Sequence, residues 1–127
     1  MESIARIDRT IYACVTDPIC TEEVVLTEER ITHIQAHHPG VYEKYGIYIR
    51  EIIEKPDYIL EDTRPNTAIV LKHIHCENEN FRLALRLVTI SDSPAYQNSV
   101  ITFMKIREKE WKREIKNKNI LYKREYI

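Results

Sequence analysis

The spacing of apolar and polar residues changes along the chain from a helical period to an alternating one. In positions 26–39, LTEERITHIQAHHP, Ile31 and Ile34 form an apolar stripe three residues apart among polar residues, which predicts an amphipathic helix. Thr27 is a favoured N-cap, the two glutamates after it suit the positive end of the helix dipole, and Pro39 ends the helix. A second helix is predicted over residues 46–55, and it turns four isoleucines inward: Ile47, Ile49, Ile52 and Ile53.

The segments around these helices have the composition of strands. Residues 10–15 and 23–26 are short β-branched runs on either side of Asp17-Pro18, which predicts a small hairpin or two edge strands. After Pro56, short turn-rich segments separate four apolar runs, at residues 58–60, 68–74, 82–90 and 100–106. Connections this short favour an antiparallel meander, because a parallel crossover needs about a dozen residues or more.

Together these elements predict an α+β fold. The N-terminal helices are expected to pack on one face of a curved antiparallel sheet of four strands or slightly more. A basic helix over residues 107–116 and a short strand over residues 120–122 complete the expected architecture. A chain of 127 residues suits one domain, so we predict a single domain over residues 1–127 with its core in residues 26–124.

Composition narrows the function classes. Two glycines in the whole chain argue against Gly-rich phosphate loops and dinucleotide-binding turns. No apolar run approaches the roughly 18 residues of a membrane span, and the first residues lack the apolar segment of a secretory signal. We therefore expect a cytoplasmic protein with no membrane contact, and export by a route without such a signal stays open.

Cysteine and charge add two expectations. The three cysteines, Cys14, Cys20 and Cys76, show no CxxC spacing, so we expect reduced, partly buried thiols, with a Cys14–Cys20 bridge geometrically possible. Residues 105–127 hold nine Lys and Arg against four Glu, a net charge of +5, so the other 104 residues carry −6. A basic end on an acidic body suggests a local anionic partner, and the alternative is an ordinary solvated helix face.

The first predicted helix carries three of the five histidines. At 100° per residue, Arg30, His33 and His37 share one face, and His38 lies in the last turn near the apolar stripe. Histidine titrates close to neutrality, so this cluster is a candidate for acid–base chemistry, and the alternative for His38 is a core-edge residue. The i, i+4 spacing of His33 and His37 could also chelate zinc, but the central glutamate of HExxH is absent. Further zinc ligands could come from the run His73, His75 and Cys76.

Because successive side chains of a strand point to opposite faces of the sheet, the sequence predicts which polar residues share a face. Arg82 and Arg86 share a face opposite three core leucines, and Thr102 is expected on one face with Val100 and Met104. Lys72 is expected on one face with Val70 and Ile74. Cations opposite a histidine-bearing helix suit RNA cleavage, which needs a base, an acid and a group that stabilises charge on the phosphate. The alternative is a solvated sheet face. Some of the eight tyrosines could stack on unpaired bases.

Several short motifs follow one another in a characteristic order along the chain. They are Arg30, His33-Ile34, His38-Pro39, Pro56-Asp57-Tyr58-Ile59, Val100-Ile101-Thr102 and Ile120-Leu121-Tyr122-Lys123. In this order the chain resembles the barnase/EndoU/colicin/RelE-like nuclease superfamily, specifically its phage- and mobile-element-associated branch. The resemblance covers about residues 26–124.

This resemblance implies a metal-independent, cofactor-free ribonuclease, often a toxin that cuts tRNA or other RNA to a cyclic phosphate. It implies RNA as substrate and a cognate immunity or antitoxin protein as partner. His33, His38 and Thr102 are the implied catalytic residues, with Arg30 orienting a histidine or contacting phosphate. By position on the strands we add Arg86 as catalytic and three substrate-binding residues, Lys72, Arg82 and Tyr122.

A second reading stays open. The chain could be a catalytically silent module of the same fold that docks a phage or mobile-element protein partner. Its basic C-terminal helix, around Trp111, Lys112 and Arg113, would then be the docking surface. The sequence carries no heptad pattern, so it predicts no oligomeric state.

Overall fold

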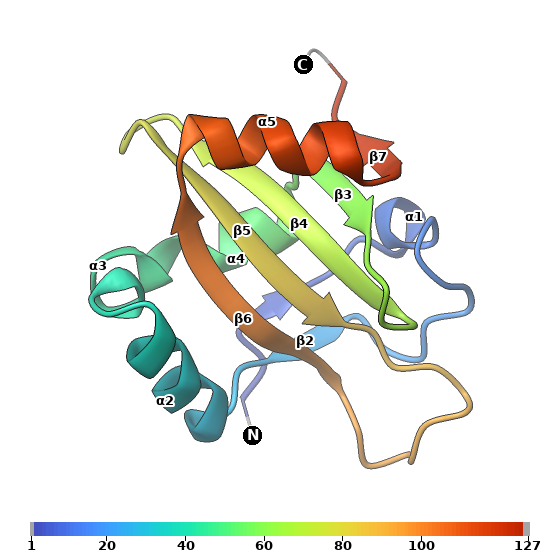
Figure 1. The fold of residues 1–127 in the computed structure, drawn as a ribbon. Coiled ribbons are helices and arrows are strands. Elements are labelled where there is room, and N and C mark those ends of the chain that lie inside the picture. Colours follow the sequence, from blue (N-terminus) through green and yellow to red (C-terminus); the bar gives the residue numbers. More distant parts are fainter. Residues whose placement is uncertain (1, 126–127) are drawn as a thin grey trace.

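One mixed sheet of seven strands organises the chain (Figure 1). The computed structural model describes residues 2–125. The sheet order is β1-β2-β6-β5-β4-β3-β7, and every neighbouring pair is antiparallel except β2 with β6. The strands are β1 (Ala5–Arg6), β2 (Glu23–Val25), β3 (Tyr58–Glu61), β4 (Thr67–Ile74), β5 (Glu79–Arg86), β6 (Asn98–Ile106) and β7 (Ile120–Lys123).

Helices cover both faces of this sheet. Against one face pack α1 (Arg9–Tyr12), α2 (Glu28–His37), α3 (Val41–Tyr45), a 3-10 turn η1 (Gly46–Tyr48) and α4 (Ile49–Glu54). Their buried residues join those of the sheet in the main core, which includes Ile34, Tyr45, Ile52, Leu83 and Phe103. The opposite face is covered by α5 (Glu108–Asn117), which crosses the strands in Figure 1. A smaller core lies beneath α5, where Trp111 and Ile115 pack on Leu60, Ile69 and Leu71.

The predicted start of α2 is confirmed. Thr27 has an extended backbone and its hydroxyl accepts a hydrogen bond from the Arg30 N–H at 3.1 Å. Glu28 and Glu29 occupy the first turn, where the helix dipole favours carboxylates. The helix ends at His37, with His38 as the C-cap before Pro39. Capping chemistry in the sequence therefore locates this helix to within a residue or two.

The α+β class is confirmed, but the predicted sheet and helix arrangement need correction. The sheet is larger than four strands and is mixed, because β2 runs parallel to the start of β6. The C-terminal helix forms, but it lies on the face opposite α2, α3 and α4. Its ten residues hold four Lys or Arg and three Glu, so the basic character belongs to the longer segment 105–127.

The predicted strand at residues 10–15 is wrong, and the short helix α1 lies there instead. Asp8 caps this helix by accepting a hydrogen bond from the Thr10 N–H at 2.9 Å. Tyr12 is fully buried and its hydroxyl donates to the Ile53 carbonyl at 2.7 Å. The antiparallel partner of β2 is therefore β1 rather than this segment. All three cysteines are free and exposed.

Three further boundaries differ from the prediction. Residues 46–55 begin with the 3-10 turn η1, which leaves Ile47 80% exposed while Ile49, Ile52 and Ile53 are buried. Strand β5 ends at Arg86 rather than residue 90, and the Leu87 N–H still donates to the Asn66 carbonyl opposite it, in the turn before β4. None of the helices in residues 2–125 is long and apolar enough to cross a membrane.

A bulge in β6 changes which residues share a face. Ala84 pairs with Thr102 but Leu85 pairs with Val100, so Ile101 is an extra residue in β6. Val100 consequently lies in the main core, while Thr102 lies on the α5 side together with Met104 and Ser99. The expected common face of Thr102 and Val100 is therefore wrong, and that of Thr102 and Met104 is confirmed.

Candidate functional site

The end of α2 gathers three imidazoles beside one guanidinium-bearing residue. Arg30, His33 and His37 are spaced three and four residues apart and so form one stripe on the helix surface. The rings of His33 and His37 lie 4.1 Å apart between centroids. His37 donates from Nδ1 to the His33 carbonyl at 3.0 Å, which leaves its Nε2 free. His38 follows directly, at the C-cap.

His38 differs electrostatically from an ordinary surface histidine. Burial lowers its pKa below the usual 6.5, and the neighbouring positive charges of His37 and His33 lower this pKa further. At neutral pH, His38 therefore carries a neutral ring with a free nitrogen that can accept a proton. His33 and His37 are exposed and open to a ligand. The end of α2 therefore holds a candidate proton acceptor, His38, close to two candidate proton donors, His33 and His37.

A second group of polar residues lies on the α5 side of the sheet. Strand register places Arg82 beside Met104, Ala84 beside Thr102 and Arg86 beside Ser99. Arg82 is tied to Glu114 of α5, with Nε and Oε1 3.0 Å apart and both side chains mostly covered. Arg86 is tied to Asp92, with Nη2 and Oδ1 2.8 Å apart. Thr102 is half-buried between these two anchored arginines.

Lys72 and Tyr122 lie on the other side of the sheet. Lys72 pairs with Phe81, a residue of the main core, and its Nζ lies 3.3 Å from the buried carboxylate of Asp57. Tyr122 packs against the same core from β7. The structure therefore does not bring these two predicted substrate-binding residues together with Arg82, Arg86 and Thr102. Alternation places Lys72 with Val70 and Ile74 as expected, and this shared face is the one covered by α1, α2, α3 and α4.

Helix α2 runs beside β6, which carries Thr102 (Figure 1). Its N-cap Thr27 and the strand residue Ser99 line the same pocket. Beyond its far end, Tyr45 of α3 packs on Phe81 with ring centroids 5.0 Å apart. The histidine end of α2 therefore lies about 15 Å further along, at 1.5 Å per residue, near the middle of β6. No hydrogen bond links the histidines to Thr102 in the part of the chain that is described.

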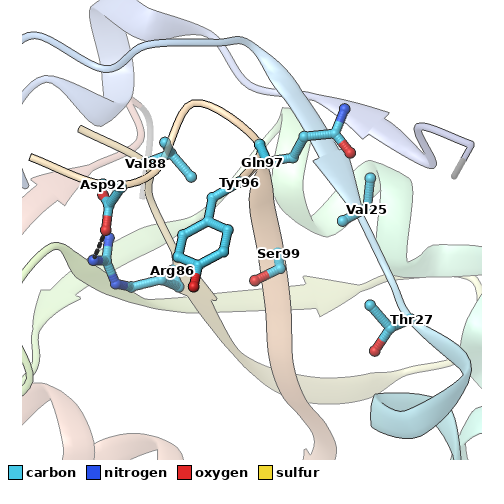
Figure 2. Close-up of a pocket in the computed structure, with 9 residues that line it drawn as sticks. Val25, Thr27, Arg86, Val88, Asp92, Tyr96, Gln97 and Ser99 are labelled. Atoms are coloured by element: carbon cyan, nitrogen blue, oxygen red, sulfur yellow. Dashed lines mark hydrogen bonds and ion pairs between the residues drawn. The ribbon is translucent and has the colours of Figure 1, made fainter. Parts of the chain in front are cut away.

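A pocket of about 580 Å³ opens at the other end of α2 (Figure 2). It lies between the start of α2, the first residues of β6 and the loop of residues 87–97. Its lining includes Arg86, Asp92, Tyr96 and Ser99. Sequence reasoning missed Asp92 and did not distinguish Tyr96 from the other seven tyrosines that could stack on bases, since both residues lie in a stretch predicted only as a turn-rich connection. An aromatic residue within that polar stretch, SDSPAYQNS, was the one available signal.

The histidines proposed as zinc ligands do not converge. Within residues 2–125, no group of three His, Cys, Asp or Glu side chains is placed to hold a metal ion. His73 and His75 have ring centroids 4.7 Å apart, but the His73 Nδ1 is engaged with the Asn80 Oδ1 at 2.6 Å. Cys76 lies near the Tyr48 hydroxyl instead, at 3.5 Å.

Comparison with family models decides the relationship suggested by the ordered motifs. Residues 2–123 match the family described as phage-Barnase-EndoU-ColicinE5/D-RelE like nuclease 2. The chain belongs to this family. Membership of this phage-associated nuclease family confirms the resemblance and indicates nuclease activity on a nucleic acid substrate. The comparisons with curated proteins and with solved structures find no match.

Proposed function

We propose that this member of the phage-associated nuclease family is a metal-independent endoribonuclease. The observation that carries the proposal is the histidine cluster at the end of α2, where the lowered pKa of His38 stands beside two exposed imidazoles. Imidazoles gathered in one place can supply both the base and the acid that RNA cleavage needs. Such a reaction requires the ribose 2′-hydroxyl, so DNA is not a substrate.

In the proposed reaction His38 is the general base and His33 the general acid. His38 takes the proton of the 2′-hydroxyl, and the resulting oxygen attacks the adjacent phosphorus. His33 donates a proton to the 5′-oxygen as its bond to phosphorus breaks. The products are a 2′,3′-cyclic phosphate and a free 5′-hydroxyl. His38 suits the role of base, because a lowered pKa keeps it unprotonated at neutral pH.

Charge on the phosphate needs a free cation and a hydrogen-bond donor. Arg30 lies on the same stripe of α2 as His33 and His37, and it forms no ion pair within residues 2–125. We assign it to the phosphoryl oxygens. Thr102 faces the α5 side of the sheet, so its implied hydrogen bond to the phosphate remains a prediction. Arg82 and Arg86 are each neutralised by a carboxylate, Glu114 and Asp92, so neither enters this scheme as the phosphate cation.

The family description supports a toxin-type role. It names colicins E5 and D and RelE, and the resemblance implies cleavage of tRNA or other RNA with a cognate immunity or antitoxin protein. We propose the same for this chain, acting in the cytoplasm of the cell in which the RNA is cut. The partner would neutralise the activity by covering the exposed histidines.

Incubation of the purified protein with total bacterial RNA in EDTA tests the proposal. We expect discrete fragments ending in 2′,3′-cyclic phosphate, and none from matched DNA. His33→Ala and His38→Ala should abolish the fragments without changing the melting temperature. His75→Ala is the matched control, because His75 is an exposed histidine outside the cluster. Intact RNA across a range of pH would overturn the ribonuclease assignment and favour the silent protein-docking module.

A further inference from the structure

The pocket at the start of α2 is separate from the histidine cluster and has no role in the reaction above. At about 580 Å³ its volume lies within the range of small-molecule sites in proteins. Apolar walls come from Val25 and Val88, and polar groups come from Arg86 and Ser99. Figure 2 shows the Tyr96 ring near Arg86 and Ser99, with Val25 and Thr27 facing them from the β2–α2 side.

The loop that forms one wall is fixed at both ends. Asp92 accepts hydrogen bonds from the Thr89 N–H at 2.8 Å and from Arg86, so it closes the first half of the loop. These bonds, first that from the Thr89 backbone, hold the pKa of Asp92 below its usual range. Asn98 is fully buried and accepts from the Val88 N–H at 2.8 Å. The pocket wall is therefore built by specific contacts and is present without a ligand.

Tyr96 is the exposed aromatic of this wall. Its side chain is 63% exposed, although the tyrosines of the core are almost fully covered. An exposed ring at a pocket mouth is a platform on which an unpaired base can stack, and such stacking is tolerant of sequence. The apolar walls then cover the other face of the base.

Arg86 supplies hydrogen-bond donors to the same space. Its guanidinium donates to the Leu87 carbonyl and to Asp92, and it makes no third hydrogen bond within residues 2–125. Of the five guanidinium N–H groups, three thus have no protein partner within residues 2–125, and the two bonds hold the guanidinium in a fixed orientation. Donors of this kind match a base edge that presents oxygen acceptors, as guanine and uracil do, better than one that presents an amino group.

From these contacts, we infer that this pocket binds one unpaired keto-bearing base, guanine or uracil, of the RNA substrate, by stacking on Tyr96 and hydrogen bonding to Arg86. The inference rests on the proposed ribonuclease function for the identity of its ligand. Because the histidines lie about 15 Å away along α2, this base belongs to a nucleotide that flanks the scissile bond. The pocket thereby sets which sequence is cut, while the histidine cluster does the cutting.

Binding of two 2′-O-methylated octanucleotides, oligo-U and oligo-C, to the wild-type protein tests the inference. These strands cannot be cleaved by 2′-hydroxyl attack, so affinity is measured whether or not the protein is a nuclease. Uracil and cytosine differ chiefly in a keto against an amino group, and we expect oligo-U to bind more tightly. Tyr96→Ala should weaken both strands roughly 5- to 150-fold, the equivalent of stacking one base. Tyr96→Phe should preserve the affinity.

Arg86→Lys separates recognition of the base from general electrostatic attraction to the RNA strand. It keeps the positive charge but loses the planar fork, so we expect the preference for oligo-U to disappear while oligo-C binding changes little. Ile47→Ala, at an exposed apolar residue outside the pocket, is the control for non-specific effects. Unchanged affinity in Tyr96→Ala together with an unchanged preference in Arg86→Lys would overturn the inference. If both variants behave as expected but RNA stays intact in the cleavage assay, the pocket stands and the ribonuclease proposal fails.

Discussion

Lys72 and Asp57 form a buried ion pair beneath the helices, with Nζ and Oδ1 3.3 Å apart and side chains 9% and 5% exposed. Asp57 also accepts a hydrogen bond from the His73 N–H at 2.8 Å, so the carboxylate ties the start of β3 to β4. Arg124 also pairs with Asp57, with Nε and Oδ1 2.9 Å apart, so Lys72→Met leaves the buried carboxylate with one cation instead of two. We therefore expect Lys72→Met to lower the free energy of unfolding by about 1–3 kcal/mol, measured by urea denaturation.

Activity distinguishes this structural role from substrate binding. In the folded protein at low temperature, Lys72→Met should cleave RNA at the wild-type rate, because Lys72 faces the core. A folded Lys72→Met variant that binds or cleaves RNA poorly would restore the role in substrate binding that strand position suggested. The double variant Lys72→Met with Asp57→Leu should recover only part of the lost stability, because Arg124 then loses its partner carboxylate.

The lowered pKa of His38 predicts the pH dependence of both activity and stability. The acid limb of kcat/KM should inflect below pH 6.5, because the base must be unprotonated. The unfolded chain, with His38 near 6.5, binds a proton before the folded chain does. The contribution of His38 to stability is therefore present above pH 6.5 and is lost as the pH falls through the lowered pKa. Denaturation of wild type and His38→Gln over pH 5–8 measures this, and equal slopes would contradict it.

Arg30 and Arg82 offer a matched pair of arginine-to-alanine substitutions. Arg30→Ala should reduce kcat/KM at least about tenfold with an unchanged melting temperature, because Arg30 serves the phosphate rather than the fold. Arg82→Ala should do the reverse, since it breaks the largely covered pair with Glu114 and costs about 1–2 kcal/mol. Steady-state kinetics and thermal melts of both variants decide the assignment. The opposite pattern would move the phosphate site to the α5 side of the sheet.

Local chemistry in the sequence predicts part of this structure. The Thr27 cap, the acidic first turn and Pro39 specify α2, and alternation specifies which side of β5 is buried. These features depend on neighbours within a few residues, so a single sequence displays them. The order of motifs also identified the family, which the match over residues 2–123 confirms.

The remaining features depend on contacts between distant residues. The sequence alone does not show that Lys72 is paired with Asp57, fifteen residues earlier, because only strand pairing brings the two residues together. The bulge at Ile101 moves Val100 into the core, and nothing in its immediate neighbours signals that shift. Strand β2 joins β6 in parallel because Asn98 reaches across to the Thr21 and Glu23 carbonyls. The Tyr96 pocket depends on the same long-range contacts.

Trp111 decides whether α5 can be a docking surface. It is half-buried against the smaller core, with its ring 5.9 Å from that of Tyr58 in an edge-to-face arrangement. Trp111→Ala should therefore cost about 2 kcal/mol of stability, less than a fully buried tryptophan. Lys112 and Arg113 are exposed, and their charge-reversed variants should fold normally and cleave RNA. Loss of a specific protein complex in those two variants, without loss of stability, would instead support the docking module.

Asn98 holds the loop of residues 87–97 to the segment around β2, because its side-chain amide both accepts and donates hydrogen bonds. Its Oδ1 accepts from the Val88 N–H, and its Nδ2 donates to the Thr21 and Glu23 carbonyls at 2.7 and 3.0 Å. Asn98→Asp keeps the acceptor but sets a buried carboxylate against two carbonyl oxygens. We expect a loss of at least about 3 kcal/mol at pH 7, measured by denaturant unfolding.

Acid should partly rescue this variant. Burial and the two carbonyls raise the pKa of the new carboxyl group, so it protonates below neutrality and regains one donor. The stability of Asn98→Asp relative to wild type should then improve as the pH falls toward 5, and the binding of oligo-U should improve in parallel because the Tyr96 loop is restored. Asn98→Ala has no titratable group and is the control. An aspartate variant as stable as wild type at pH 7 would show that the amide does not bridge β2 and the loop.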